Sequence, residues 1–194
     1  MSTTFRSILT VVVLLAAGCS STDGRVLSPP DVTTTLPTVD PIPVPEDADP
    51  TALLLLSPDF GDYEELPTQF TTEGEGAIPE LFWENLPEDT QEVAIVVTDP
   101  INNTAVHWAV WGLDPTLGAI GATLPADAKE SANYLGEQGW APPVREDGVM
   151  HTYVFTLYAL DQPLALEPGG DPQEAVSQIA MAATRSAELV GLLI

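Results

Sequence analysis

The sequence contains very few cysteine, histidine, lysine and arginine residues. Among its 194 residues are one cysteine, two histidines and five Lys or Arg, against 29 Asp or Glu, which gives a formal net charge of −24. A single cysteine excludes an intramolecular disulfide, so an apolar core must stabilise the fold. The shortage of basic residues argues against nucleic acid as a partner and against docking of the domain on an anionic lipid surface.

The first residues differ from the rest of the chain and have the pattern of an export signal. Arg6 precedes an apolar stretch at 8–17, which is too short to span a membrane and suits a signal peptide. The segment LAAGC at 15–19 resembles the lipobox of bacterial lipoproteins, which implies cleavage before Cys19 and lipidation of that residue. We therefore expect residues 1–18 to be a signal peptide and the mature protein to be lipid-anchored on the extracytoplasmic face of a bacterial cell membrane. A plain secretory signal with an incidental cysteine is the alternative.

Residues 19–50 have no hydrophobic periodicity and contain seven prolines among Ser, Thr and Asp. This composition predicts a disordered tether with polyproline-II character that begins at the lipidated Cys19. The folded domain should then comprise residues 51–194.

Apolar runs and turn residues predict that this domain is mainly β. The run at 92–98 is apolar nearly throughout, as expected for a strand that is covered on both faces. The segment 114–147 is rich in Gly, Pro and Ala and is expected to hold only short helical turns. The predicted strands are 53–56, an edge strand near 66–71, 80–84, 92–98, 106–113 and 151–160.

The end of the chain predicts the one clear helix. Asp171 suits the N-cap, Pro172 suits the first helical position, and Glu174 completes a capping box. Apolar residues then recur at helical spacing and would form the face that packs on the sheet: Val176, Ile179, Ala180, Ala183, Ala187 and Val190.

Both histidines open apolar strands, and an aspartate closes another. Six residues separate Asp99 from the strand at 106–113, which predicts a hairpin that makes Asp99 and His107 neighbours. His151 and Tyr153 should point to the same face because side chains alternate along a strand. The hypothesis is a pocket of these four side chains at one end of a sheet.

Within such a pocket, Asp99 would raise the pKa of both imidazoles and fix their tautomers, so that N–H groups could meet an anion. Taken alone, the residues favour two strand-end histidines with ordinary hydrogen bonds and a turn aspartate. Zinc would suit two His and an Asp, but the spacing has no local chelating pattern, and we expect no metal.

Five motifs occur in one order along the chain: PELFWENLPEDTQEVAIVVTDP, VHW, GWAPP, HTYVFTLYALD and AELVG. Together they resemble the phosphatidylethanolamine-binding protein family in its bacterial Raf-kinase-inhibitor-like branch, over about residues 53–192. The resemblance implies a two-sheet antiparallel Greek-key sandwich with a C-terminal helix. It also implies a small pocket for phosphate-like head groups or small carboxylates.

The same resemblance implies ligand-binding roles for seven residues: Asp99, His107, Trp140, Pro142, Pro143, His151 and Tyr153. Three positions depart from the family pattern. Ile101 and Asn103 stand where its turn has Asp and Pro, and Thr152 stands where it has Arg. These departures remove a polar wall and a fixed cation, so they bear on the identity of the ligand.

We therefore expect a lipid-anchored binding protein for a small anionic or phosphorylated ligand, with no cofactor and no catalytic residue. One alternative is an interaction protein that inhibits or regulates an extracytoplasmic enzyme through segment 114–147. Another is a weak hydrolase that uses water activated by His and Asp. The hydrolase lacks a nucleophile, because Ser57, Ser131 and Ser177 have no nucleophile-elbow context.

Overall fold

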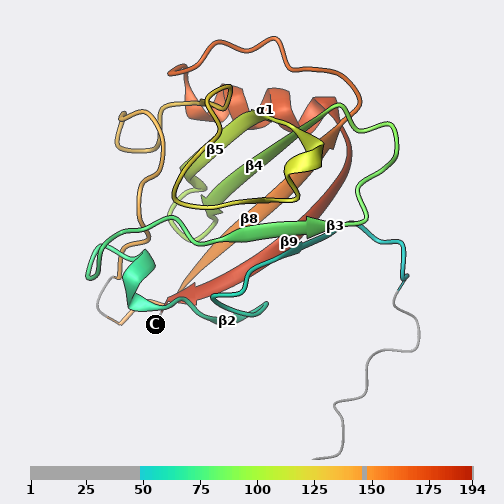
Figure 1. Cartoon of the computed structure of the whole chain (residues 1–194). Coiled ribbons are helices and arrows are strands. Elements are labelled where there is room, and N and C mark those ends of the chain that lie inside the picture. The colour runs from blue at the N-terminus through green and yellow to red at the C-terminus, as the bar shows by residue number, and fades with distance from the viewer. Residues whose placement is uncertain (1–48, 146–147, 194) are drawn as a thin grey trace, which may run out of the picture. The chain divides into compact units, whose positions relative to one another are not determined.

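The structure, a computed structural model, describes residues 49–145 and 148–193 (Figure 1). The predicted signal peptide, Cys19 and nearly all of the predicted tether lie outside these residues. Among the residues described, no helix is long and apolar enough to cross a membrane.

The described chain forms two sheets, as the sequence predicted. The smaller sheet has the order β1 (Leu54–Leu56), β3 (Leu81–Glu84) and β6 (Ala119–Ile120). The larger sheet has the order β2 (Glu64–Glu65), β9 (Ala183–Leu193), β8 (His151–Leu160), β4 (Glu92–Asp99), β5 (Ala105–Leu113) and β7 (Lys129–Glu130). All these strand pairs are antiparallel except that of β2 with β9, which is parallel. The Greek-key connectivity stays a prediction.

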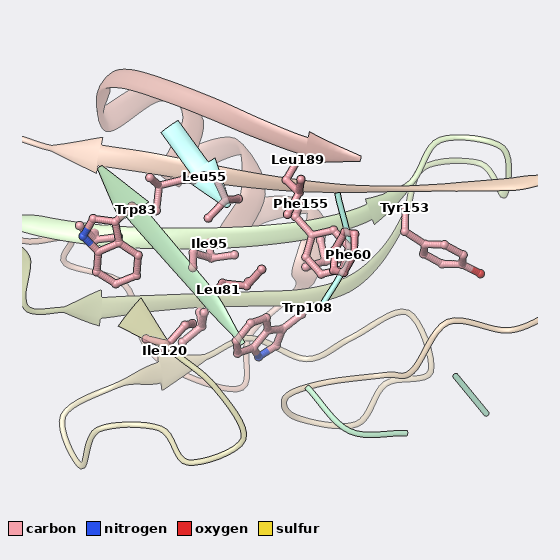
Figure 2. Close-up of a cluster of buried hydrophobic side chains, with 14 of the residues drawn as sticks. Leu55, Phe60, Leu81, Trp83, Ile95, Trp108, Ile120, Tyr153, Phe155 and Leu189 are labelled. Carbon is pink, nitrogen blue, oxygen red and sulfur yellow. The ribbon is translucent and has the colours of Figure 1, made fainter. Parts of the chain in front are cut away.

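The main apolar core lies between the two sheets, where side chains from both gather (Figure 2). Leu81 of β3 and Ile95 of β4 are fully buried there. At one end of the cluster, Tyr153 points its hydroxyl group away from the other side chains. Four large aromatic side chains are also buried: Trp83, Trp108, Trp111 and Phe155.

A second apolar cluster covers the opposite face of the larger sheet, beneath helix α1 (Pro172–Ala182). Ala94 and Val96 of β4 belong to this cluster, whereas Ile95 and Val97 belong to the main core. The continuous apolar run of β4 is therefore explained by burial on both faces.

Helix α1 begins as predicted and ends much earlier than predicted. The Asp171 carboxylate accepts a hydrogen bond from the Glu174 N–H at 2.9 Å, and Pro172 is the first helical residue. The expectation that the helix continues to Val190 was wrong, because Ala183–Leu193 is strand β9. This strand pairs with β8 along its whole length and buries Leu189 and Leu193 in the main core. That pairing and burial outweigh the helix propensity of its Ala, Glu and Leu residues.

Two further expectations need correction. The edge strand predicted near 66–71 is instead the short strand β2, followed by a 3-10 turn at Thr68–Phe70. The segment 114–147 contains the expected helical turn at Pro115–Leu117, but it also supplies the short strands β6 and β7. Strands of two residues carry too few positions to show an alternating pattern.

Candidate functional site

The predicted hairpin brings the candidate residues to one end of the larger sheet. Strand β4 ends at Asp99, which lies opposite Ala105 of β5. Strand β8 begins at His151 and pairs with β4 on its other side. Asp99, His107, His151 and Tyr153 all line one cavity, so the four side chains do come together.

The direct partner of Asp99 is His151, not His107. Asp99 Oδ2 accepts a hydrogen bond from His151 Nδ1 at 2.6 Å. Asp99 Oδ1 accepts from the N–H groups of Ile101 at 2.9 Å and Asn102 at 3.2 Å, and both members of the Asp99–His151 pair are buried. These bonds hold the carboxylate in place and put the Nδ1 proton of His151 toward it, so a ligand would meet this ring through Nε2.

His107 is held differently. Its Nδ1 lies 2.9 Å from the carbonyl oxygen of Ala141, and a carbonyl only accepts, so Nδ1 carries a proton. Its ring packs against Tyr134 and against the edge of Tyr153, with centroid distances of 4.6 and 5.0 Å. Burial lowers the pKa of His107 and outweighs the opposite effects of the Ala141 carbonyl and Asp99. Asp99 does raise the pKa of His107, as expected, but burial lowers that pKa by more, so the net shift is downward.

Tyr153 connects the sheet to the loop above it. Its hydroxyl group donates to the carbonyl oxygen of Val144 and accepts from the Val144 N–H, both at 3.0 Å. The ring itself is only 1% exposed. This double contact fixes the segment around Val144 as one wall of the cavity.

The cavity is small, with a volume of about 120 Å³. Pockets for drug-sized ligands usually measure about 300–1,000 Å³, so this cavity is too small for a ligand of that size. Sequence reasoning missed three of its lining residues. Asn102 lies in the predicted hairpin and could have been found there, whereas Tyr134 and Val144 lie in an irregular segment with no periodic signal.

Three residues assigned to the pocket by resemblance do not line it. Trp140 packs edge-on against Trp108 in the core, with ring centroids 5.8 Å apart, and its Nε1–H donates to the Gly76 carbonyl oxygen. Pro142 and Pro143 lie in the same loop but are absent from the cavity wall. This loop contributes through Val144 and through the Ala141 carbonyl that holds His107.

The departures from the family pattern also lie off the cavity wall. Ile101 is 57% exposed and reaches the site only through its N–H bond to Asp99. Asn103 is exposed at a positive φ of 48° in the hairpin turn. Thr152 alternates with His151 along β8 and is not among the lining residues. Among the described residues, no group of three or more His, Cys, Asp or Glu side chains is placed to hold a metal ion.

Comparison with known proteins agrees with this geometry. The family model described as phosphatidylethanolamine-binding protein matches residues 56–193. The chain belongs to this family. The match includes every strand of the larger sheet and all of the cavity wall.

Relatives within the phosphatidylethanolamine-binding protein family include a mycobacterial protein and solved structures. A Mycobacterium tuberculosis protein named "Putative lipoprotein LppC" is 37% identical over 184 residues, covering 93% of this chain and 90% of its own. A homologue from Chlamydia trachomatis, CT736, has 26% identity and a TM-score of 0.68, covering 74% of this chain and 98% of its own. Escherichia coli YbcL shares the fold at 21% identity, with a TM-score of 0.68 and coverage of 72% and 96%.

Proposed function

We propose that this family member is an exported, lipid-anchored binding protein whose cavity takes a small anionic or phosphorylated group. The observation that carries the proposal is the convergence of His107, His151 and Tyr153 on one small cavity beside the buried Asp99 carboxylate. Buried polar groups that converge on a cavity are typical of binding sites, and the size of this one favours a head group over a whole lipid.

The tautomers predict how an anion binds. Nδ1 of each histidine donates within the protein, so a neutral ring presents a lone pair at Nε2, which repels an anion. Protonation turns Nε2 into a donor, and Asp99 lies close enough to balance the charge on His151. Anion binding should therefore take up a proton and strengthen as the pH falls from 8 to 6.

The charge of the whole chain limits the affinity. A formal net charge of −24 repels an approaching anion, so association should be slow and binding modest. Screening at physiological ionic strength confines this repulsion to about 8 Å. Adding a salt whose anion does not compete for the site should screen this repulsion and therefore strengthen ligand binding slightly.

The proposal of a lipid anchor has separate support. The segment LAAGC at 15–19 ends in the one cysteine of the chain. The alignment with LppC covers 93% of the chain, which is more than residues 49–194 alone can supply. The likeness to a protein named as a lipoprotein therefore extends into the segment that precedes the domain.

NMR titration tests the pocket, because there are only two histidines to assign. Inorganic phosphate, phosphoethanolamine and acetate should each be added at pH 6 and pH 8. We expect the ring resonances of His107 and His151 to shift, more strongly at pH 6.

His151→Ala and His107→Ala should remove the pH dependence. Thr152→Ala is the matched control, since it alters the same strand outside the cavity wall and should bind as the wild type does. If neither histidine responds to any of the three compounds, the proposed site is wrong.

A further inference from the structure

Strand β9 has a free edge over part of its length. It pairs with β8 from Ala183 to Leu193, but on its other side β2 reaches only Gly191 and Leu192. Within the part of the chain that the structure describes, no strand pairs with the outer edge of β9 at 184–188. An unpaired edge of this kind is a template for another extended segment.

The hydrogen bonds beside β2 show which backbone groups face outward. The N–H of Val190 donates to Asp62 Oδ1, and the Val190 carbonyl accepts from the Tyr63 N–H, so both groups of Val190 point away from β8. Because backbone groups alternate along a strand, those of Ser186 and Glu188 point the same way. The outward carbonyl of Thr184 already accepts from Arg185 Nη1 at 3.0 Å. Ser186 and Glu188 are exposed residues on this edge.

A large groove adjoins this edge. Its volume is about 660 Å³, and Arg185 and Ser186 of β9 line one part of it. Segments 51–53 and 85–88 line the rest, together with Asp49. Leu53, Leu86 and Pro87 supply apolar surface, so the groove offers contacts for side chains beside a strand edge that offers hydrogen bonds.

The charges in the groove indicate what could bind. Asp49 and Glu88 line it, and Glu188 is exposed on the adjoining edge. Arg185, the one cation among the lining residues, donates to the neutral Thr184 carbonyl and keeps its charge, so the three carboxylates outnumber it. A second copy of this chain would bring another net charge of −24. The chain's own residues 40–48 contain three acidic residues and no basic one.

We propose that the groove and the free edge of β9 bind an extended, Lys- or Arg-rich segment of another protein by strand addition. Backbone bonds to Ser186 and Glu188 would supply affinity, and the acidic lining would select basic side chains. No residue of the His107 cavity takes part, so this interaction is independent of the anion site.

Peptide binding to the full chain in detergent micelles tests the proposal. The probe is the blocked peptide Lys-Val-Lys-Val-Lys-Val, and its acidic counterpart replaces each Lys with Glu. We expect the basic peptide to bind at least tenfold more tightly and to slow hydrogen exchange at the Ser186 and Glu188 amides. Ser186→Pro deletes an outward N–H without removing a bond to β8, and it should weaken binding at least tenfold. Ser186→Ala keeps that N–H and should bind as the wild type does.

Several outcomes would overturn the proposal. Equal binding of the two peptides would show that the groove does not select basic side chains. Unchanged binding by Ser186→Pro would show that the peptide does not bind by strand addition. Slow exchange of the Ser186 amide in the peptide-free chain would mean that the edge is already covered. Dependence of that protection on protein concentration would identify a second copy as the occupant, and independence would identify the chain's own N-terminal residues.

Discussion

The two histidines illustrate how position changes the chemistry of one side-chain type. His107 is held by a backbone carbonyl between two tyrosine rings, and burial favours its neutral form. His151 has the Asp99 carboxylate 2.6 Å from Nδ1. A bound anion therefore meets two different imidazoles. Burial disfavours the positive charge on His107, whereas the positive charge on His151 would have the Asp99 carboxylate beside it.

The lowered pKa of His107 predicts how stability depends on pH. The unfolded chain binds a proton at His107 more readily than the folded chain does. The folded state therefore becomes less stable as the pH falls through about 6.5, the ordinary histidine pKa. His107→Asn should remove this contribution, because Asn does not titrate and can still donate to the Ala141 carbonyl. Urea unfolding at pH 7.5 and pH 5.5 should show a smaller loss of stability in the variant than in the wild type. Thr152→Ala keeps both histidines and should lose as much as the wild type. An equal loss in His107→Asn and the wild type would contradict the prediction.

At the scale of elements, the sequence predicted the strands that have a long pattern. The apolar run of β4, the short hairpin after Asp99 and the alternation of His151 with Tyr153 were enough to assemble most of the site. Tyr134 could not be predicted, because its place depends on a bond from its N–H to the Val106 carbonyl oxygen across an irregular segment. Trp140 was predicted to contact the ligand because of the family resemblance, whereas its ring packs against the Trp108 ring.

Strand β9 was missed for a different reason. Its residues Ala183, Ala187 and Val190 continue the helical spacing of α1, so the local pattern favours one long helix. Residues four apart share a face in a helix and in a strand alike, so the burial of Leu189 and Leu193 in the main core fits both. Pairing with β8 decides between the two, and this long-range contact is absent from local sequence.

Gly191 should be essential to the packing of this strand. A Cβ built there lies 2.5 Å from Cδ2 of Leu66, which is 2% exposed and has little room to move. Gly191→Ala should therefore destabilise the domain by about 1–3 kcal/mol through overpacking. Gly121→Ala is the control, because its nearest contact would be 3.9 Å and its effect should stay within about 0.5 kcal/mol. Chemical denaturation measures the free energy of unfolding of both variants. If Gly191→Ala left that free energy unchanged, Leu66 would have room to shift and the prediction would be wrong.

At the scale of the whole molecule, the folded part should not depend on the residues before it. Residues 20–194 and 51–194 should melt within a few degrees of each other, because the removed segment is polar and rich in proline. The Asn85 side chain donates to the carbonyl oxygens of Pro50 and Ala52, and the shorter chain keeps the Ala52 bond. Removing β1 as well, by starting at residue 57, should prevent cooperative folding because Leu55 is 3% exposed in the core. A large loss in the 51–194 chain would mean that earlier residues stabilise the domain.

The last prediction concerns how the molecule is held at a membrane. Each buried CH₂ of an acyl chain contributes about 0.8 kcal/mol, so the several chains of a lipidated N-terminal cysteine would anchor a domain whose acidic surface offers no attraction to anionic lipid. Cys19→Ala removes the thiol that accepts the lipid, and the protein should move from the detergent phase to the aqueous phase on phase separation. Ser21→Ala keeps the thiol and should partition as the wild type does. Mass spectrometry of the N-terminal peptide should find acyl chains on wild-type Cys19 and on no other residue. If wild type and Cys19→Ala partition alike and the peptide carries no acyl mass, the chain is exported without a lipid anchor, and the His107 cavity must then meet its ligand in solution.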